Sequence, residues 1–150
     1  QIECQLLGDA NSINKTSISK SKLDEWVNQN LVNYLGTSDH VERLIAQCNC
    51  VVLPSYREGM PRSILESYAI GRPVIASDVP GCREIVEHNI NGLLCEVKSP
   101  EDLSKKMLTM MNMSQEERLI LGKNGRKKVE TLFDEKIVIN KYLKIINNIV

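Results

Sequence analysis

Short apolar runs of strand length alternate along this chain with segments whose apolar residues recur at helical spacing. The apolar runs lie at residues 2–9, 31–36, 50–55, 72–79 and 91–97. The middle three alternate little between apolar and polar positions, as expected of parallel strands that are covered on both faces. Strands separated by helices favour right-handed crossovers. The pattern therefore predicts an α/β fold, with an open parallel sheet of about five strands and helices on both faces.

Two of the intervening segments have clear helical periodicity. In the first, the apolar residues stand at i, i+3, i+4 and i+7, and they are Val41, Leu44, Ile45 and Cys48. The second segment contains Ile64 and Tyr68 on its apolar side, and Gly71 is expected to end it. Because Pro61 suits the first position of a helix, we expect this second helix to begin near Met60.

The last third of the chain has a purely helical pattern. Ser99 stands three residues before Asp102 with a proline between them, which predicts a capped helix start. Ser114 and Glu117 have the spacing of a capping box and predict another. A final helical tail carries one apolar stripe through Val138, Tyr142, Ile145 and Ile149. This stripe needs a partner surface.

Composition and charge limit the possible functions. The 150 residues suit one domain, and the 19 basic and 19 acidic residues cancel. No broad field would attract nucleic acid, so a phosphate-bearing ligand must be held by helix N-termini or a few arginines. No apolar stretch approaches the length of a membrane span. The five cysteines are odd in number and lack a second Cys/His pair at zinc-site spacing. We expect a reduced cytoplasmic setting, no metal site and no nucleic-acid partner.

Two common nucleotide-binding motifs are absent from the sequence. The first strand run ends in Gly8-Asp9 instead of G-x-G-x-x-G, and no G-x-x-x-x-G-K-[ST] occurs. These absences count against a nicotinamide dehydrogenase and against a P-loop protein.

Residues 57–66 place two carboxylates around a predicted helix start. Glu58 follows an apolar run, at the edge where open α/β sheets bind their ligands. Glu66 is expected roughly 7–8 Å farther along the helix axis. Between them, the free N–H groups from Gly59 to Ser63 suit a phosphate. A nucleoside diphosphate sugar has the same order of groups, namely sugar hydroxyls, diphosphate and ribose hydroxyls, and carboxylates accept strong hydrogen bonds from diols.

Simpler interpretations stay open on spacing alone. Glu58 could be a charge that favours the helix dipole. Glu66 could pair with Arg62 at i, i+4 on a solvated face, although Arg62 could also reach a phosphate. Two acids eight positions apart could even form a glycosidase pair, but the sequence does not determine their separation in space.

Residues 51–97 resemble the donor-binding half of glycosyltransferase family 4, which contains retaining enzymes of the GT-B fold. The family's mark is E-x7-E after an apolar strand, followed by A-x-G-x-P-V-I-A and N-G-L-L. This chain has Glu58 and Glu66, then matching residues at 69–76 and 91–94. The likeness reaches back through residues 6–9 and 32–36 and forward to the last helices. It implies a Rossmann-like sheet.

The resemblance also implies a role for each matching residue. Glu58, the one catalytic candidate, would contact the hydroxyls of the donor sugar as a binding and orienting group, not as a nucleophile. The backbone just before the helix would approach the sugar and the diphosphate, and Glu66 would hold the ribose. The turn after the second strand run would lie near the base. The donor-binding candidates are Glu58, Gly59, Met60, Pro61, Arg62, Glu66, Gly36, Thr37 and Ser38.

The implied donor is a nucleotide sugar, which we expect to be a UDP-sugar. The form that the family motifs take at residues 56–86 is most similar to bacterial enzymes that add hexoses or N-acetylhexosamines to lipid-linked capsule, lipopolysaccharide or glycan precursors. A lipid-linked or polysaccharide acceptor would be held by a separate N-terminal domain, peripherally at the inner face of the membrane. Such enzymes need no metal or other cofactor and carry no D-x-D, and this sequence has none either. Retention is usually described as front-face substitution, with the diphosphate helping to deprotonate the acceptor.

The departures from the family concern what precedes residue 1. The match begins at the family's second donor-domain strand, so the first strand and helix, which bring an Arg and a Lys to the diphosphate, have no counterpart. We therefore expect residues 1–150 to be the C-terminal nucleotide-sugar-binding domain of a longer enzyme, inactive alone and prone to self-association. In the order 3-2-1-4-5-6 the absent strand is central. The remaining strands must close a gap, recruit a strand, or leave an edge exposed.

Two alternatives to a glycosyltransferase stay open. One is a nucleotide-sugar epimerase of the same GT-B fold, and the other is a non-catalytic nucleotide-binding module. The sequence names neither the sugar nor the acceptor.

Overall fold

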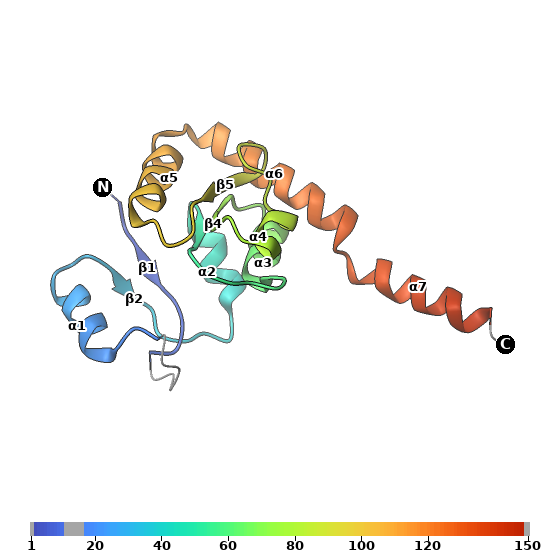
Figure 1. Cartoon of the computed structure of the whole chain (residues 1–150), viewed down its shortest axis with the longest axis horizontal. Helices are drawn as coiled ribbons and strands as arrows, with labels where there is room; N and C mark the ends of the chain where they lie inside the picture. The colour runs from blue at the N-terminus through green and yellow to red at the C-terminus, as the bar shows by residue number, and fades with distance from the viewer. Residues whose placement is uncertain (1, 11–16, 149–150) are drawn as a thin grey trace. The chain divides into compact units, whose positions relative to one another are not determined.

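The computed structural model describes residues 2–10 and 17–148. Helices and parallel strands alternate along these residues, and a helical tail follows (Figure 1). The chain divides into two compact units, Gln1–Val41 and Glu42–Val150. The α/β class and the parallel strand direction predicted from the sequence are confirmed.

The first unit is built on two short parallel strands joined by a helix. These elements are β1 (Gln5–Leu6), α1 (Lys20–Asn28) and β2 (Asn33–Tyr34). Gln5 is opposite Asn33 and Leu6 is opposite Tyr34. Backbone hydrogen bonds extend this pairing beyond the strands, from Asn33 N to the Cys4 carbonyl at 2.8 Å and from Gly8 N to the Gly36 carbonyl at 2.8 Å.

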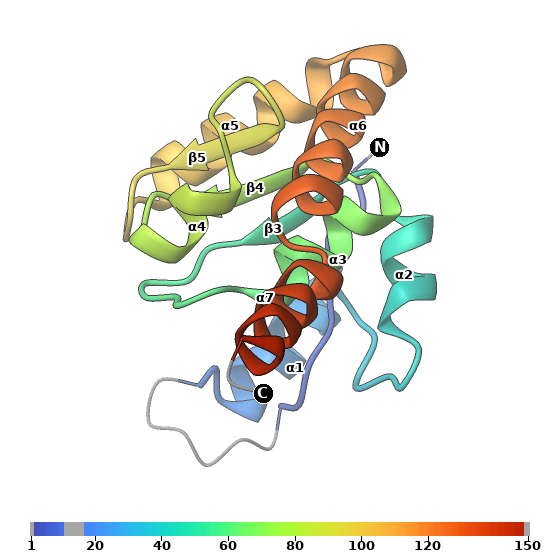
Figure 2. The same cartoon turned by 90° about the vertical axis from the view of Figure 1, so that its right-hand side faces the viewer.

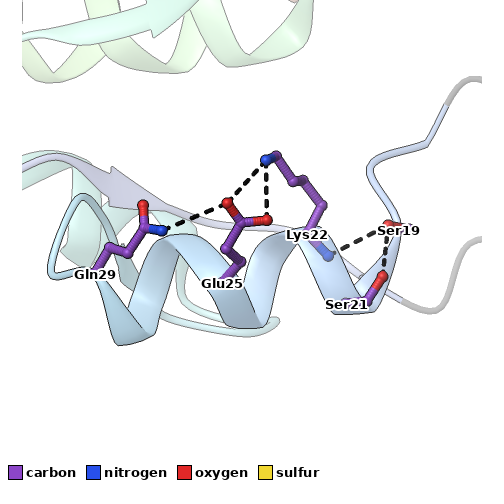
Figure 3. Close-up of polar contacts among 5 residues, drawn as sticks. All are labelled: Ser19, Ser21, Lys22, Glu25 and Gln29. Carbon is purple, nitrogen blue, oxygen red and sulfur yellow. Dashed lines mark hydrogen bonds and ion pairs between the residues drawn. The ribbon is translucent and has the colours of Figure 1, made fainter.

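Helix α1 has a side-chain cap and a surface ion pair. The Ser19 hydroxyl accepts a hydrogen bond from the Lys22 N–H at 3.3 Å, which satisfies one first-turn donor. The Lys22 Nζ atom lies 2.9 Å from Glu25 Oε2, and Gln29 donates to the same carboxylate (Figure 3). Both side chains of this pair are about half exposed.

The second unit contains the remaining strands and helices. Helix α2 (Val41–Gln47) begins at the boundary between the units. It is followed by β3 (Val51–Leu53), α3 (Arg62–Ile70), β4 (Val74–Ser77), α4 (Pro80–Ile85), β5 (Gly92–Cys95), α5 (Pro100–Asn112), α6 (Gln115–Leu132) and α7 (Glu135–Asn147).

Strands β3, β4 and β5 lie side by side in one parallel sheet (Figure 2). Val51 is opposite Val74, and Val74 is in turn opposite Gly92. Strand β4 is central and buried along its whole length, whereas β3 is only partly buried. Since all three strands run in the same direction, their carboxyl ends meet at one edge, where the loop after β3 begins.

Both faces of this sheet are covered by helices. On one face α3, α4 and α6 contribute to a cluster of Ile64, Tyr68, Val74, Ala76, Val79, Cys82, Ile85, Val86 and Val129. On the other face α5 and α6 contribute to a cluster of Ile75, Leu93, Met110 and Leu121. Successive residues of a strand point to opposite faces. Covering both faces therefore explains why the strand runs lack polar alternation.

The capping signals in the last third of the sequence are confirmed. The Ser99 hydroxyl accepts from the Asp102 N–H and caps α5, which has a proline in its first turn. Ser114 and Glu117 form a complete capping box at the start of α6. Helix α3 ends at Gly71, which adopts a left-handed φ of 82°.

The five expected strands are present, but they are shorter than the apolar runs and fall into two sheets, β1-β2 and β3-β4-β5. These are the pairings that the order 3-2-1-4-5-6 leaves when strand 1 is removed. Within the described residues, β1 pairs only with β2 and β3 pairs only with β4. Among the described residues, β1 and β3 thus each lack a strand partner on one side.

Candidate functional site

The loop after β3 carries Glu58 to the carboxyl edge of the sheet. Strand β3 ends at Leu53 and α3 begins at Arg62, so Glu58 lies in the connection between them. Its side chain is half-buried, whereas the neighbouring Gly59 and Met60 are exposed. The sequence therefore placed Glu58 correctly, ahead of the helix and after the strand.

Helix α3 begins at Arg62, later than expected from the position of Pro61. Pro61 is the N-cap residue, with an extended backbone of φ −70° and ψ 111°, and is buried. A proline fits the N-cap position as well as the first helical position, because neither requires its absent N–H group. The expectation that Pro61 would be the first helical residue was wrong by one position.

The first turn of α3 has no side-chain cap within the described residues. By contrast, side chains cap the N-termini of α1, α5, α6 and α7. The Ile64 N–H bonds back to the Pro61 carbonyl at 3.1 Å. The N–H groups of Arg62 and Ser63 precede it and have no acceptor inside the helix. This end of α3 can therefore donate hydrogen bonds to an anion.

Glu66 lies on the outer side of α3, about 6 Å along the axis from Arg62. Its carboxylate Oε1 is 3.5 Å from Nη2 of Arg62, and the two side chains are 43% and 89% exposed. The i, i+4 ion pair of the simpler interpretation is thus present. Because an exposed pair of this kind is weak, it leaves the carboxylate available to a ligand.

A shallow hollow of about 310 Å³ adjoins Glu66. Its other lining residues come from α3, from α6 and from the start of α7, and they are Leu65, Ala69, Val129, Glu130, Phe133 and Asp134. Most of these side chains are apolar, so the hollow places Glu66 at the rim of an apolar surface.

The opposite side of α3 is held firmly in the core. Ile64 and Tyr68 are completely buried. The Tyr68 hydroxyl donates to the Asn91 side-chain oxygen at 2.9 Å, and Asn91 in turn donates to the Ile85 carbonyl at 3.1 Å. Burial raises the pKa of Tyr68, so the hydroxyl stays a donor. This network fixes the helix that carries Glu66.

Helix α6 approaches α3 closely through two glycines. A β-carbon at Gly122 would lie 2.0 Å from the Gly71 carbonyl oxygen, and one at Gly125 would lie 2.3 Å from the ring of Tyr68. Only glycine allows these contacts, because real β-carbons are essentially never found closer than 3.0 Å to another heavy atom. Packing against α6 therefore restricts α3 at its C-terminal end.

Two contacts around the Glu58 loop were missed from the sequence. The Lys98 Nζ atom lies 5.4 Å from the centroid of the Tyr56 ring, which ties the loop to the turn after β5. The Cys82 thiol in α4 has its pKa raised to about 11, first by burial and second by the negative charge of Glu58. The charge of Glu58 therefore acts on a thiol of α4. Both contacts join residues far apart in the chain, and no local pattern signals them.

A larger hollow of about 650 Å³ lies beside β5, and its lining includes neither Glu58 nor Glu66. It is lined by Asp78, His88, Leu94, Glu96, Val97 and Lys106. Several of its polar groups are engaged within the protein. His88 Nδ1 accepts from the Leu94 N–H at 2.9 Å, and Asp78 lies 2.7 Å from Arg83. We therefore assign no ligand to this hollow.

The three candidates Gly36, Thr37 and Ser38 belong to the first unit, and the two glutamates belong to the second. Gly36 adopts a φ of 71° directly after β2, and its carbonyl accepts from Gly8 N. The Ser38 hydroxyl accepts from the His40 N–H at 3.0 Å. The predicted role of these residues near a base stays a prediction.

No group of three or more His, Cys, Asp or Glu side chains able to hold a metal occurs among residues 2–10 and 17–148. In the same part of the chain, no helix is both long enough and apolar enough to cross a membrane. All five cysteines are free thiols.

A match to a family model decides the family. The model for glycosyl transferases group 1 matches residues 3–128, most of the chain. The chain belongs to this family. The matched residues of this group 1 glycosyl transferase include every candidate site residue named above.

Two curated glycosyltransferases are similar to this chain over about a third of their own length. The chain is 35% identical over 126 residues to N,N'-diacetylbacillosaminyl-diphospho-undecaprenol alpha-1,3-N-acetylgalactosaminyltransferase of Campylobacter jejuni, covering 84% of the chain and 33% of that protein. It is 29% identical over 117 residues to UDP-Gal:alpha-D-GlcNAc-diphosphoundecaprenol alpha-1,3-galactosyltransferase of Escherichia coli, covering 71% and 30%. The chain thus spans about a third of the length of these relatives.

Solved structures share the fold of this group 1 glycosyl transferase. HepE of Anabaena in complex with UDP matches with a TM-score of 0.86 at 23% identity, over 98% of this chain and 41% of that one. Its complex with UDP-glucose matches with a TM-score of 0.84 at 24% identity, over 99% and 41%. The expected Rossmann-like GT-B fold is confirmed.

Proposed function

We propose that this chain is the donor-binding part of a longer, retaining glycosyltransferase that takes its sugar from a UDP-sugar. One observation carries the proposal: the uncapped N-terminus of α3 lies between Glu58 in the preceding loop and Glu66 on the outer side of the same helix. This order of acceptor, donor and acceptor groups complements sugar hydroxyls, a diphosphate and ribose hydroxyls.

Each group has a distinct task in this proposal. Glu58 accepts hydrogen bonds from the donor sugar and orients its anomeric carbon toward the acceptor. The Arg62 and Ser63 N–H groups, at the positive end of α3, stabilise the charge that develops on the leaving diphosphate. Glu66 holds the ribose. The turn at residues 36–38 lies near the base.

The proposal includes metal independence. The uncapped helix end and the exposed Arg62 guanidinium offer positive charge for the diphosphate without a bound ion. The chain spans about a third of the length of its curated relatives. We therefore propose that residues 1–150 are the C-terminal donor-binding domain, and that the acceptor is held by another part of the protein.

The relatives support a lipid-linked acceptor. The Campylobacter jejuni and Escherichia coli proteins are both named for acceptors joined through a diphosphate to undecaprenol. The HepE structures hold UDP or UDP-glucose. We propose the same classes of ligand here, namely a UDP-hexose or UDP-N-acetylhexosamine as donor and a lipid-linked glycan as acceptor, used at the inner face of the membrane.

A donor screen on the full-length enzyme tests this function. The protein is incubated with a panel of UDP-hexoses and UDP-N-acetylhexosamines, with and without an undecaprenyl-diphosphate-linked sugar, and the products are identified by mass spectrometry. A lengthened lipid-linked glycan, formed in the presence of a metal chelator, is the expected result. An epimerised sugar with free UDP would show an epimerase instead, and binding without any turnover would show a non-catalytic module.

A further inference from the structure

The peptide bonds on either side of Gly59 rest directly on the first turn of α4. A β-carbon at Gly81 would lie 2.0 Å from the Gly59 carbonyl oxygen and 2.6 Å from the Glu58 carbonyl oxygen. Real β-carbons are essentially never found within 3.0 Å of another atom. The loop therefore takes its position only because residue 81 has no side chain.

The requirement at Gly81 is steric. The glycines with positive φ are Gly8, Gly36 and Gly71, so the Gly81 backbone has a conformation that other residues adopt freely. Gly59 is the opposite case, since a β-carbon there would meet no atom within 4 Å. The E-G pair in the sequence draws attention to Gly59, but the close contact in the structure depends on Gly81.

Helix α4 is the rigid partner in this contact. Cys82 and Ile85 are completely buried, and Val79 and Val86 are nearly so, in the cluster that also contains Ile64 and Tyr68. The Arg83 Nε atom lies 2.7 Å from Asp78 at the end of β4, which adds a surface tie. The loop, in contrast, is largely exposed at residues 56–60. A side chain at position 81 would therefore move the loop and not the helix.

The contact acts on the carboxylate that is assigned to the sugar. Glu58 contributes its own carbonyl to the contact with Gly81, and its charge also raises the pKa of the neighbouring Cys82 thiol. The Glu58 backbone therefore lies against α4. Glu66, on the outer side of α3, has no part in this contact.

We propose that Gly81 is a positioning residue for the donor sugar, which lets α4 support the Glu58–Gly59 peptides and so determines where the Glu58 carboxylate meets the sugar hydroxyls. The inference rests on the proposed function, because it needs Glu58 to be the group that contacts the sugar. It adds a sugar-specific role to a residue outside the E-x7-E stretch. Loss of the contact should weaken the binding of UDP-sugar but not the binding of UDP.

Gly81→Ala in the full-length enzyme is the direct test, and Gly122→Ala is its matched control. The two added β-carbons each overlap a backbone carbonyl oxygen at the same 2.0 Å, but the Gly122 overlap is with Gly71, at the far end of α3. Both variants should unfold at lower temperature. Gly81→Ala should bind UDP-sugar about tenfold more weakly, the loss of one charged hydrogen bond, and bind UDP within about twofold of the unmodified enzyme.

The turnover number, kcat, provides a second test of the same variants. A displaced orienting group should lower kcat of Gly81→Ala by up to about 100-fold, because small misplacements cost that much. Gly122→Ala should change UDP and UDP-sugar binding by one common factor. Suppose that Glu58→Ala selectively weakens the binding of UDP-sugar. The inference is then overturned if Gly81→Ala changes the affinities for UDP and UDP-sugar equally, or changes neither. If Glu58→Ala itself shows no selective loss, the proposed function fails and the inference fails with it.

Hydrogen exchange on the unmodified enzyme tests the contact without relying on a variant that folds. UDP-sugar, compared with UDP, should slow amide exchange in residues 81–83 as well as in residues 58–60, because the two segments support each other. Slower exchange confined to residues 58–60 would overturn the inference.

Discussion

Replacing Glu66 with alanine separates a ligand contact from a surface ion pair. The Glu66 carboxylate is 3.5 Å from Arg62, and the side chains are 43% and 89% exposed. An exposed i, i+4 pair contributes about 0.3–0.5 kcal/mol. Alanine has a slightly better helix propensity than glutamate, which offsets part of this loss. The free energy of unfolding should therefore change by less than about 0.5 kcal/mol, a shift of about 3 °C or less in Tm.

The effect on ligand binding should be much larger. If Glu66 accepts hydrogen bonds from the ribose, its removal loses a charged hydrogen bond of about 1.5–3 kcal/mol. This corresponds to roughly 10- to 150-fold weaker binding. Because UDP and a UDP-sugar carry the same ribose, both should weaken by the same factor.

Calorimetric titration and thermal unfolding of the full-length enzyme measure the two effects. Glu25→Ala is the matched control, because Glu25 is 47% exposed and forms a similar helical ion pair with Lys22 (Figure 3). Both variants should unfold within about 3 °C of the unmodified protein. The ribose role is refuted if Glu66→Ala binds UDP as tightly as Glu25→Ala does.

Three further predictions concern the chain itself. Residues 1–150 alone should transfer no sugar from a UDP-sugar to a lipid-linked acceptor, because the two substrates are not held together; transfer above background in a product assay would contradict this. The isolated chain should form dimers or aggregates in light scattering, because among the described residues β1 and β3 lack a partner on one side and most apolar residues of α7 are exposed. A stable monomer at high concentration would count against this. In denaturant unfolding, Tyr68→Phe should lower the free energy of unfolding by about 1 kcal/mol and Asn91→Ala should lower it by about 3 kcal/mol. The second loss is larger because Asn91 also forms hydrogen bonds with Ile85 and Glu87. Equal losses would contradict the network.

Local signals in the sequence predicted the helix ends well. The caps at Ser99 and Ser114 each join residues three positions apart, so the sequence pattern alone predicts them. Pro61 was misplaced by one position because proline suits both the N-cap and the first helical residue. Of the final apolar stripe, Ile149 lies outside the described residues, and Val138, Tyr142 and Ile145 are exposed.

The pairing of strands was less accessible from the sequence. An apolar run shows that a strand is buried, but it does not show which neighbour completes its hydrogen bonds. The described strands pair as β1-β2 and β3-β4-β5, and each pairing joins residues many positions apart. The resemblance to a known strand order implied these neighbours, but it left open whether the remaining strands would form one sheet or two.

In the candidate site, too, features formed by residues near in sequence could be predicted, and contacts between distant residues could not. Their spacing placed Glu58 and Glu66 around one helix start, and the resemblance to a family supplied their roles, which stay predictions. The contact of Gly81 with the Glu58 loop depends on how α4 packs against α3 and α6, and the preceding proline suggests only a turn. Distant close approaches of this kind need the folded structure.

Titration of Glu58→Ala with UDP and with UDP-sugar tests the central claim most directly. UDP has no sugar to contact, so the full-length variant should bind UDP as the unmodified enzyme does. It should bind UDP-sugar about tenfold more weakly or worse, and its kcat should also fall, because a contact that orients the anomeric carbon counts more in the transition state. Unchanged binding of both ligands, or an equal loss for both, would contradict the assignment of Glu58 to the donor sugar.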